Sequence, residues 1–366
     1  MSGPGAGEPT ALDLFCGAGG MSAGLADAGL RVAGAVDSWS VAVDTYRLNF
    51  PDHRAACLDL RGSSFEAVAA ELGLEGRPDV VVGGPPCQGF SIQRIGSDSD
   101  DRNNLVLEFA RLVAEARPRL YLMENVLGLV GKRGQALVEA FTRYLRSQGY
   151  TVESIRANAA EYGLPQVRWR VFFYGWPVGD PPFGFPPPTH AAGQFRTVWD
   201  AIGDLPSPPT EAPADPLHRR TKLSPTNLLR LKYIPPGGGF ESLPPELRVN
   251  CHKNGAARIG HRYVYGRLAP AAPAATITAR FDSFTRGKFA HPFEDRNITL
   301  REGARLQGFP DDFEFRGTQE EIAALIGNAV PPPLAAVIGK GVAAYLRGEQ
   351  GDRREHAAQL ALFHGA

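Results

Sequence analysis

Short apolar runs alternate with amphipathic stretches along the first 175 residues of the chain. The runs are rich in β-branched residues and have the length of strands, whereas the stretches between them, such as 21–28 and 105–116, have the length and spacing of helices. Strands are predicted at seven places, namely 11–15, 32–36, 54–58, 79–82, 119–123, 152–157 and 170–174. Because strands and helices alternate, the pattern predicts an α/β fold with a doubly wound, mostly parallel sheet.

The pattern changes beyond this region. Two stretches, 181–188 and 205–216, are dense in proline, which excludes regular helix and interior strand and predicts connecting loops. Helical spacing returns near residue 296 and continues through 334–346. We therefore expect a first domain over 1–178, a smaller, irregular domain with its linkers over 179–288, a segment over 289–346 that returns to the first domain, and a tail over 347–366.

The chain carries no net charge, since 39 Lys and Arg balance 39 Asp and Glu, but the charges are unevenly distributed. Between residues 216 and 288 there are thirteen basic and three acidic residues. Such a basic segment in a neutral protein is typical of a surface that contacts phosphates, and it favours a nucleic-acid partner. A solvated face that is neutralised by acids elsewhere is the alternative.

Four cysteines are scattered along the chain without a C-x-x-C spacing, at positions 16, 57, 87 and 251. This spacing indicates free thiols in a reducing compartment and argues against a structural zinc site. The sequence shows neither a run of about 18 apolar residues nor a signal-peptide pattern, so we expect a cytoplasmic protein that does not span a membrane.

Chemically versatile residues follow several predicted strands at their carboxyl ends. They are the loop after 13–15, Asp37, Asp59, Cys87 and Glu124. Ligands of a doubly wound sheet bind beyond these ends of the strands. Five such positions along one edge therefore predict a binding site.

The first of these positions is a glycine-rich turn over 15–20, between a strand and a helix. Its glycines allow the backbone to approach a ligand, and the helix N-terminus favours a carboxylate or a phosphate. Asp37 lies twenty residues after Gly17, where an acid can accept hydrogen bonds from both ribose hydroxyls. The turn is not a full G-x-G-x-x-G, so a ribose-bearing cofactor other than a dinucleotide is favoured; a plain tight turn is the alternative.

Cys87 stands between the stiff pair Pro85-Pro86 and the flexible pair Gln88-Gly89, next to a polar run over 97–104. This setting indicates a nucleophile on an active-site loop, although burial is the usual fate of a free cysteine. A loop thiol needs a lowered pKa in order to attack a substrate.

Three further residues complete the predicted chemistry. Glu124 ends an apolar strand, where a carboxylate is either a general acid with a raised pKa or a satisfied structural acid. Arg168 and Arg170 lie two residues apart, hence on one face of an extended segment. Their positive charge would lower the pKa of the Cys87 thiol, and structural salt bridges are the alternative.

Together these motifs resemble those of the C5-cytosine DNA methyltransferases, in that family's usual order and over nearly the whole chain. The first motifs are Asp13-Leu14-Phe15-Cys16-Gly17-Ala18-Gly19-Gly20, Gly84-Pro85-Pro86-Cys87-Gln88-Gly89-Phe90-Ser91, Glu124-Asn125-Val126 and Gln166-x-Arg168-x-Arg170. The later ones are Arg267 with Thr276-Ile277-Thr278, Arg305-Leu306-Gln307-Gly308-Phe309-Pro310, and Gly327-Asn328-Ala329-Val330-Pro331-Pro332. The resemblance implies a Rossmann-like methyltransferase domain over 1–178, and it makes the basic segment part of a target-recognition domain.

The resemblance implies S-adenosylmethionine as the cofactor, S-adenosylhomocysteine as its product, and no metal. Cys87 would add to C6 of a cytosine extruded from double-stranded DNA, and Glu124 would protonate N3. Arg168 and Arg170 would hold the base at O2. C5 would then accept the methyl group, and loss of the C5 proton would expel the thiolate.

The resemblance also implies which residues bind the cofactor. The residues expected around the methionine part of the cofactor are Phe15, Gly17, Gly19 and Gly20. Asp37 would contact the ribose, and Asp59 and Leu60 would contact the adenine. The other residues expected at this site are Ser38, Pro85, Leu105, Asn328 and Val330. Two departures from the family are Asp37, where glutamate is commoner, and Ser38, where some members have an aromatic residue against the adenine.

Three alternatives were compared with this interpretation. An RNA methyltransferase of the same fold is the nearest, but the large segment between Trp176 and Gly266 favours a DNA reader. A catalytically silent relative would lack Cys87 or Glu124, and both are present. A zinc deaminase needs a second cysteine three residues after Cys87, where Phe90 stands. We therefore expect a monomeric DNA methyltransferase associated with the nucleoid, with a cognate restriction endonuclease as a further candidate partner.

Overall fold

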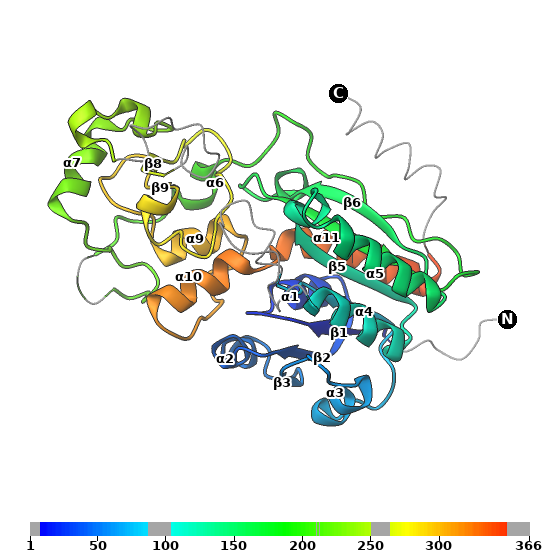
Figure 1. Cartoon of the computed structure of the whole chain (residues 1–366). Helices are drawn as coiled ribbons and strands as arrows, with labels where there is room; N and C mark the ends of the chain where they lie inside the picture. Colours follow the sequence, from blue (N-terminus) through cyan, green and yellow to red (C-terminus); the bar gives the residue numbers. More distant parts are fainter. Residues whose placement is uncertain (1–7, 87–103, 210, 212, 250–263, 350–366) are drawn as a thin grey trace. The chain divides into compact units, whose positions relative to one another are not determined.

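The computed structural model describes residues 8–86, 104–209, 211, 213–249 and 264–349 of the 366. The chain forms two compact units. The first unit comprises Met1–Tyr162, Trp169–Ala191 and Ala329–Ala366, and the second comprises Gly163–Arg168 and Ala192–Asn328. The chain therefore leaves the first unit twice and returns to it twice. The colours of Figure 1 allow the reader to follow this path.

A seven-stranded sheet organises the first unit (Figure 1). Its strands are β1 (Thr10–Leu14), β2 (Arg31–Asp37), β3 (Ala55–Cys57), β4 (Val80–Gly83), β5 (Leu120–Val126), β6 (Glu153–Asn158) and β7 (Trp169–Gly175). They lie in the order β3-β2-β1-β4-β5-β7-β6. Neighbours pair in parallel except at β7, which is antiparallel to both β5 and β6. The seven predicted strands and the mostly parallel sheet are confirmed.

The order of the strands reverses at the neighbouring pair β1 and β4. From β1 the chain proceeds to β2 and β3 on one side, whereas β4 leads to β5 on the other. In sheets of this kind, ligands bind beyond the carboxyl ends of the strands at such a reversal. The segments that follow β1 and β4 here are the glycine-rich turn and Gly84-Pro85-Pro86.

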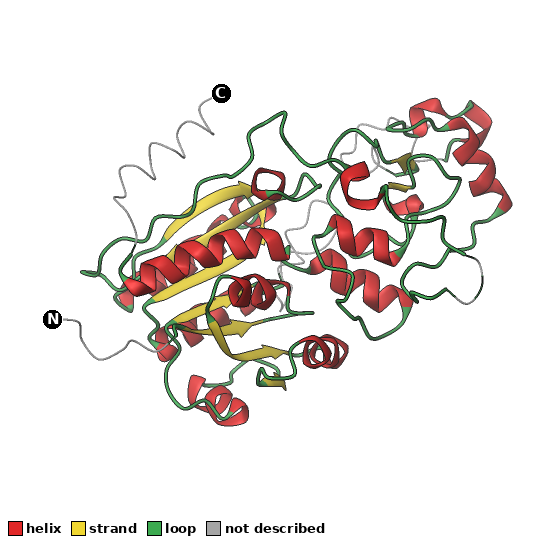
Figure 2. Ribbon diagram, turned by 180° about the vertical axis from the view of Figure 1, so that it is seen from behind, coloured by secondary structure: helices red, strands yellow, loops and turns green. Residues whose placement is uncertain are grey.

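Helices cover both faces of this sheet (Figure 1, Figure 2). The helices of the first unit are α1 (Gly20–Asp27), α2 (Ser40–Asn49), α3 (Phe65–Leu72), α4 (Asn104–Ala116), α5 (Gln135–Ser147) and α11 (Pro332–Arg347). On one face α4 and α5 lie side by side, and on the other α1 packs along α11. The sheet is therefore doubly wound, as predicted.

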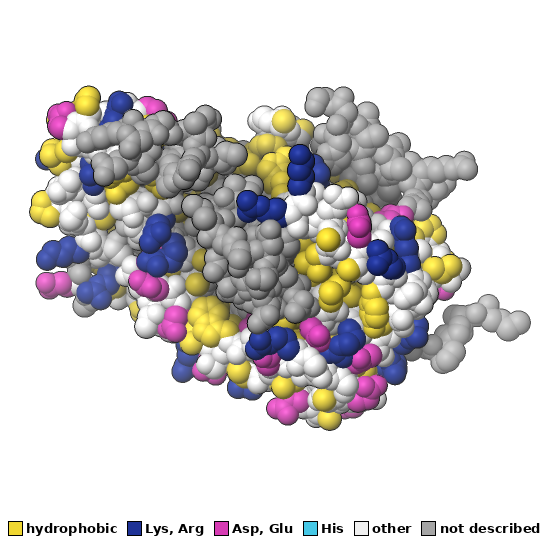
Figure 3. All heavy atoms as spheres, in the orientation of Figure 1, with side chains coloured by type: hydrophobic (Ala, Val, Ile, Leu, Met, Phe, Trp, Pro, Cys, Tyr) yellow, Lys and Arg dark blue, Asp and Glu magenta, His cyan; other side chains and the backbone are white. Residues whose placement is uncertain are grey.

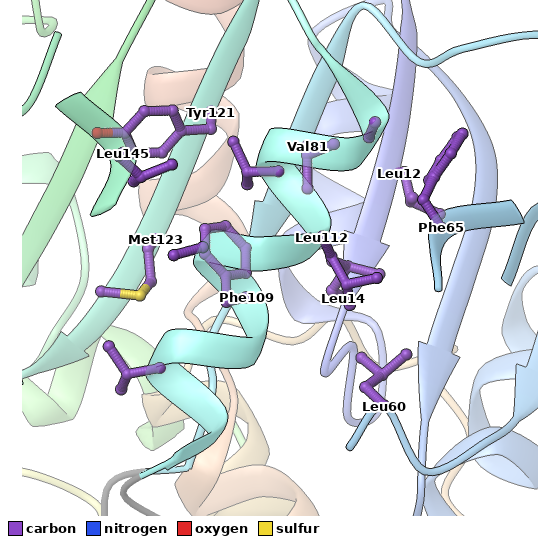
Figure 4. Close-up of a cluster of buried hydrophobic side chains, with 14 of the residues drawn as sticks. Leu12, Leu14, Leu60, Phe65, Val81, Phe109, Leu112, Tyr121, Met123 and Leu145 are labelled. Carbon is purple, nitrogen blue, oxygen red and sulfur yellow. The ribbon is translucent and has the colours of Figure 1, made fainter. Parts of the chain in front are cut away.

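An apolar core fills the space between α4 and the sheet (Figure 4). Phe109 and Leu112 of α4 are at most 1% exposed and face Leu14, Val81 and Met123 of the strands. Full burial of one such side chain stabilises the fold by about 1.5–3 kcal/mol. This core fixes α4 and the carboxyl ends of β1, β4 and β5 as one rigid support.

Glycine permits the close approach of α1 and α11. A Cβ atom at Gly24 would lie 2.4 Å from the Cβ of Ala335, and one at Gly339 would lie 2.9 Å from the Cβ of Ala28. Such distances are shorter than any contact that two packed side-chain atoms make. The contact holds α11 against the first unit.

Elements of the second unit are short. They are α6 (Val198–Ile202), α7 (Pro225–Tyr233), β8 (Gly266–Arg267), β9 (Lys288–Ala290), α9 (Leu300–Leu306) and α10 (Gln319–Asn328), and β8 pairs with β9 in parallel. Most of the described backbone between these elements is loop and turn. Proline and glycine interrupt regular helices and strands, and the elements of this unit are accordingly short.

The two units divide the chain differently from the predicted domains. Residues 289–328 lie in the second unit, because β9 pairs with β8 and the ring of Phe289 packs against that of Phe281, with 6.5 Å between centroids. Residues 179–191 lie in the first unit, because Phe183 and Phe185 are buried against Tyr174. The long-range contacts of these segments decide where they belong, and no local pattern reveals them.

The run Gln319–Arg347 is long and apolar enough to cross a membrane. It comprises α10 and α11, and 72% of its most apolar window is buried inside the protein. The same length and composition are found in core helices, whose apolar side chains pack against other elements. Burial therefore accounts for the apolar character of this run.

Arg267 of β8 binds two separate segments of the second unit, 231–234 and 291–295. Its side chain is 5% exposed, and its five N–H groups all donate hydrogen bonds. The acceptors are the backbone carbonyls of Leu231, Ile234, His291 and Glu294 and the carboxylate of Asp295, at 2.6–2.9 Å. A guanidinium is the side chain with enough donors for this task, because irregular backbone leaves carbonyls without a strand or helix partner.

Candidate active site

The turn after β1 is built from left-handed backbone conformations. Phe15, Gly17 and Gly19 have φ angles of 61°, 55° and 96°, so that the chain reverses sharply before α1 begins at Gly20. A Cβ atom at Gly19 would lie 2.5 Å from the ring of Phe50, which excludes any larger residue there. A Cβ atom at Gly17 would meet nothing within 4 Å, so the space beside Gly17 is open.

Gly20 allows the segment before α11 to approach the same turn. A Cβ atom at Gly20 would lie 2.2 Å from the carbonyl oxygen of Val330. Two residues expected at the cofactor site, Gly20 and Val330, therefore lie side by side in the first unit. Asn328, also expected there, is exposed at the end of α10 and belongs to the second unit.

Asp37 ends β2 and supports the glycine-rich turn. Its carboxylate accepts hydrogen bonds from the backbone N–H groups of Gly17 and Trp39, one on each oxygen and both at 2.9 Å. Burial raises the pKa of Asp37, although these N–H donors oppose the shift. Each oxygen keeps a further lone pair, so the carboxylate can still accept from a pair of hydroxyl groups, as a ribose diol offers. The hydrogen-bonding capacity of this carboxylate therefore fits the expected cofactor. Ser38, which follows Asp37, is exposed.

Asp13 is a buried acid at this turn that the sequence reasoning did not single out. It is 1% exposed in the middle of β1, and the hydroxyl of Ser22 donates to it at 2.6 Å. Burial raises the pKa of Asp13 to about 7, and the nearby charge of Asp37 acts in the same direction. An acidic residue inside an otherwise apolar strand was the signal for this site.

Asp59 and Leu60 follow β3 in a loop. The carboxylate of Asp59 accepts hydrogen bonds from the backbone N–H, Nε and Nη2 of Arg61, and these bonds lower the pKa of Asp59. Leu60 is 2% exposed and belongs to the apolar core of Figure 4. One residue thus anchors the loop while its neighbour presents a carboxylate to solvent. Arg61, the partner of Asp59, was not anticipated.

Glu124 forms an ion pair with Arg170. Glu124 Oε1 and Arg170 Nε are 2.8 Å apart, and the side chains are 11% and 13% exposed. The pair is possible because β5 and β7 are antiparallel neighbours and β5 continues to Val126, so that Glu124 lies within the strand and not just after it. In a partly desolvated pair, each charge fixes the position of the other.

Asn125 connects β5 to the segment that leads to Cys87. Its side-chain N–H donates to the carbonyl oxygen of Pro85 at 3.0 Å, and both residues are buried. A Cβ atom at Gly84 would lie 3.7 Å from Glu124 Oε2, so the backbone of this segment runs close beside the carboxylate. Asn125 was part of a predicted motif, but the sequence did not indicate a role for its side chain.

Cys87 and residues 88–103 lie outside the described residues, so its predicted role as nucleophile stays a prediction. Leu105, expected at the cofactor site, is half-buried in the first turn of α4. Of the other cysteines, Cys16 is buried and Cys57 is exposed, both as free thiols, and Cys251 lies outside the described residues. Burial raises the pKa of Cys16, so this thiol is held in its neutral form.

Arg168 has partners quite different from those of Arg170. It is 1% exposed, and its Nη1 and Nη2 donate at 3.0 Å to the carbonyl oxygens of Ile277 and Gly327. The boundary between the two units falls between Arg168 and Trp169, the residue at which β7 begins. The two arginines were expected to act together on one face of an extended segment, but each is bound within a different unit.

Gln166 holds the same short segment in the second unit. Its side-chain N–H donates to the carbonyl of Leu306 at 3.0 Å and to the side chain of Gln307 at 2.8 Å, and its carbonyl accepts from the N–H of Ile277 at 2.9 Å. Val167 adds a backbone bond to Ala274. Three motifs that are far apart in the sequence therefore meet at residues 163–168.

Most of the basic segment is engaged within the second unit. Six of its ten described basic side chains bind carbonyls, hydroxyls or acids there, namely Arg220, Arg230, Arg248, Arg267, Arg280 and Lys288. The other four, Arg219, Lys222, Lys232 and Arg286, are exposed. On the face in Figure 3, basic and acidic side chains lie interspersed. Among the described residues, the basic side chains of this segment therefore include both engaged and free-standing exposed groups, and its predicted contact with phosphates stays a prediction.

Comparison with known proteins identifies relatives along almost the entire chain. A family model described as C-5 cytosine-specific DNA methylase matches residues 10–344. The Type II methyltransferase M1.HphI of Haemophilus parahaemolyticus is 36% identical over 343 residues, which cover 91% of this chain and 86% of the relative. The Type II methylase M.HgiDII of Herpetosiphon aurantiacus is 32% identical over 346 residues, covering 92% of this chain and 96% of the relative.

Solved structures agree with this assignment. A chain from E. coli, assigned as a prophage-encoded DNA modification methyltransferase, superposes with a TM-score of 0.69 at 28% identity, covering 93% of this chain and all of the other. The Dnmt2 methyltransferase of S. pombe, at 19% identity and a TM-score of 0.59, shares the fold. Methyltransferases of this kind use S-adenosylmethionine, which the turn at Gly17 and Asp37 fits. The chain belongs to the C-5 cytosine-specific DNA methylases and is a DNA cytosine-5 methyltransferase.

Proposed function

We propose that this methyltransferase modifies a cytosine extruded from a specific sequence in double-stranded DNA, with Cys87 as the nucleophile. The observation that carries the proposal is the 2.8 Å pair of Glu124 and Arg170, beside the backbone of Gly84 and Pro85 that leads to Cys87. This arrangement brings an acid of β5, a cation of β7 and the backbone that leads to Cys87 close together. These are the groups that activation of a cytosine ring requires.

In the proposed reaction, the Cys87 thiolate forms a bond to C6 of the cytosine, and the electron pair of the C5–C6 double bond becomes available at C5. Glu124 in its protonated state delivers a proton to N3, so that no negative charge builds up on the ring. S-adenosylmethionine, when bound, supplies an electrophilic methyl group to C5. A base such as a water molecule then takes the C5 proton, and the electron pair of the C5–H bond re-forms the C5–C6 double bond as the C6–S bond breaks. The sulfur leaves as the restored thiolate, and N3 returns its proton to Glu124.

Arg170 would hold both the base at O2 and the Glu124 carboxylate, because one guanidinium presents donors in two directions. For Arg168 we propose a positioning role instead of the expected contact with the base. Its bonds to Ile277 and Gly327 fix residues 163–168, and Arg170 follows two residues later. Arg168 would thus act on the base only through the position of Arg170.

For the cofactor, we propose that the turn over 15–20 surrounds the methionine part and that Asp37 accepts the ribose hydroxyls. Two observations support this: the space beside Gly17 is open, and the Asp37 carboxylate retains acceptor capacity on both oxygens. Asp59 and Leu60 would contact the adenine. The remaining proposed contacts are Ser38, Pro85, Leu105, Asn328 and Val330.

The second unit is proposed to read the DNA sequence. Arg219, Lys222 and Lys232 are exposed within a stretch, 216–234, that has no acidic residue, and so they are candidates for phosphate contacts. We further propose a monomeric enzyme of a restriction-modification system, with an endonuclease of the same specificity as its partner. Relatives named as Type II methyltransferases support this proposal.

Base-resolution mapping of 5-methylcytosine tests the proposal, in DNA from a host that lacks C5 methylation and expresses this protein. We expect methylation at one short sequence motif. Cys87→Ala should abolish it, whereas the matched variant Cys57→Ala, which removes an exposed thiol, should retain it. Methylation by Cys87→Ala would refute the covalent mechanism, and modified RNA with unmodified DNA would refute the substrate.

A second experiment isolates the covalent step. Duplex DNA in which fluorine replaces the C5 hydrogen of the target cytosine has no C5 proton to lose, so the C6–S bond cannot be broken after methyl transfer. We expect a protein–DNA adduct that survives denaturing electrophoresis and maps to Cys87 by mass spectrometry. An adduct at another residue would reassign the nucleophile.

A further inference from the structure

The segment 58–65 consists of the loop between β3 and α3 together with Phe65, the first residue of α3, and it carries Asp59 and Leu60, the proposed contacts to the adenine. We call it the adenine loop. Leu60 and Phe65, which are 2% and 5% exposed, anchor it in the apolar core that also contains Phe109 and Leu112 of α4 (Figure 4). The polar residues between these anchors have no strand or helix to fix their backbone. Something else must therefore determine the conformation of this part of the loop.

Three charged side chains of α4 form a partly buried triad. The Nε and Nη2 of Arg111 lie 3.0 and 2.6 Å from Glu108 Oε2, and its Nη1 lies 2.6 Å from Glu115 Oε1. Glu108, Arg111 and Glu115 are spaced at one helical turn, so they share one side of α4. Their side chains are only 23%, 27% and 31% exposed. A planar guanidinium held from both sides fixes both carboxylates.

Each member of the triad also binds the backbone of the adenine loop. Glu108 accepts from the N–H of Gly62 at 3.2 Å, Arg111 donates to the carbonyl of Ser63 at 2.6 Å, and Glu115 accepts from the N–H of Phe65 at 2.7 Å. Three backbone groups within four consecutive residues are therefore held by one side of one helix.

A hydrogen bond within the adenine loop connects the residues held by the triad to Asp59. The hydroxyl of Ser63 donates to the carbonyl oxygen of Asp59 at 2.7 Å, so that the residue bonded to Arg111 is itself bonded to the proposed adenine contact. The helix at the other end is rigid, because the opposite side of α4 is packed in the apolar core. The path from that core to Asp59 consists of short hydrogen bonds throughout.

We propose that Glu108, Arg111 and Glu115 are positioning residues for the cofactor, which hold the adenine loop in the conformation that presents Asp59 to the adenine, next to the buried anchor Leu60. The proposal rests on the proposed cofactor site and adds a role for three residues outside it. A loop that is ordered before binding loses less conformational entropy when the ligand binds. Loss of the triad should therefore weaken binding of the adenosine part and leave the methyl-transfer step intact.

The test is binding of S-adenosylhomocysteine to the full chain by calorimetry, together with steady-state kinetics. In Arg111→Met we expect the Kd for S-adenosylhomocysteine and the KM for S-adenosylmethionine to rise together by about tenfold. The kcat and the Kd for DNA should stay within about twofold of the wild type. Arg111→Lys should show an intermediate loss, because an ammonium group cannot bridge both carboxylates.

Arg119→Met is the matched control. Arg119 is half-exposed in the same unit, pairs with Asp79 at 3.9 Å, and precedes the amino end of β5, away from the strand ends that carry the site. It should bind S-adenosylhomocysteine like the wild type. Hydrogen exchange at the amides of Gly62 and Phe65 should accelerate in Arg111→Met and not in Arg119→Met.

Each outcome separates the two proposals. If Arg111→Met binds S-adenosylhomocysteine as tightly as the control, while exchange at Gly62 and Phe65 is faster, the triad is structural only and the inference is overturned. If Arg111→Met does not fold, Glu115→Gln, which keeps the helix and removes one charge, must show the weaker binding. If the wild type itself fails to bind S-adenosylhomocysteine, the proposed cofactor site fails and the triad role falls with it.

Discussion

The two units of this protein are stabilised in different ways. In the first, seven strands satisfy one another's backbone groups, and apolar side chains such as Leu14 and Phe109 fill the space beneath the helices. In the second, strands of two and three residues satisfy little backbone, and buried arginines such as Arg267 donate to the carbonyls that remain. In the first unit the backbone groups pair with one another, so the buried side chains can be apolar. In the second unit many backbone carbonyls need side-chain donors, so charged side chains are buried there.

We expect the largest losses of stability when one buried residue of each unit is replaced. Phe109→Ala should lower the free energy of unfolding by about 3–5 kcal/mol, because it leaves a cavity in the core between α4 and the sheet. Arg267→Met should cost a similar amount for another reason, since it removes a hydrogen-bond donor from each of four backbone carbonyls. Urea denaturation measures both, and hydrogen exchange localises each loss to its unit. A mild effect of Arg267→Met would show that water replaces the guanidinium and would remove the contrast.

Asp13 provides a test of a buried acid in the sheet. Its pKa is raised from 3.8 to about 7, so the native state binds a proton more tightly than the unfolded state does. The contribution of Asp13 to stability is therefore fully present below about pH 4 and is lost as the pH rises to 7, with a total change of at most about 4 kcal/mol. Asp13→Asn cannot ionise, so its stability relative to the wild type should increase over this range. Parallel pH profiles of the two proteins would show that the carboxyl does not titrate there.

The two arginines on either side of the unit boundary sharpen the comparison at the level of activity. Arg170→Lys should lower kcat by about a hundredfold with little change in stability, because it disturbs the pair with Glu124. Arg168→Lys should mainly destabilise the second unit, because it withdraws donors from Ile277 and Gly327. Single-turnover kinetics and urea denaturation of both variants distinguish these effects. A larger loss of kcat in Arg168→Lys would favour a direct contact of Arg168 with the base.

The smallest expected effect concerns a rule that both units share. Ser64 caps α3 in the first unit by accepting from the N–H of Ala67, and Thr197 caps α6 in the second by accepting from the N–H of Asp200. Replacing either residue by Ala should cost about 1 kcal/mol. Equal losses in thermal denaturation would show that local helix chemistry is the same in both units, and that the difference between them lies in tertiary contacts.

Much of the first unit could be predicted from the sequence because its strands are short, apolar and separated by helices. Asp37 and Glu124 could be placed because residues at the ends of parallel strands meet at one edge of the sheet. Arg168 could not, because the alternation of side chains holds only within one strand, and β7 begins one residue later. The unit boundary at this point depends on Gln166 reaching Leu306 and Gln307, a contact across about 140 residues that no local pattern encodes.

The hydrogen-bonding partners of charged residues were harder to predict from the sequence than the positions of those residues in the fold. The basic segment was expected to form a phosphate-binding surface, yet Arg230 and Lys288 donate to carbonyls of the second unit. Asp59 was expected beside the adenine, and its bond to Arg61 became visible only in the structure. A charged residue can be located along the chain from the sequence, but the group that neutralises it depends on the folded arrangement.

The contact between α1 and α11 has a consequence for the order of events during biosynthesis. A ribosome makes α1 among the first segments and α11 among the last, with about 300 residues between them, so the first unit cannot complete its helical layer until nearly the whole chain has been translated. The second unit, whose segments are contiguous apart from residues 163–168, is available earlier. A nascent chain would therefore complete its second unit before α11 could close the helical layer beside α1.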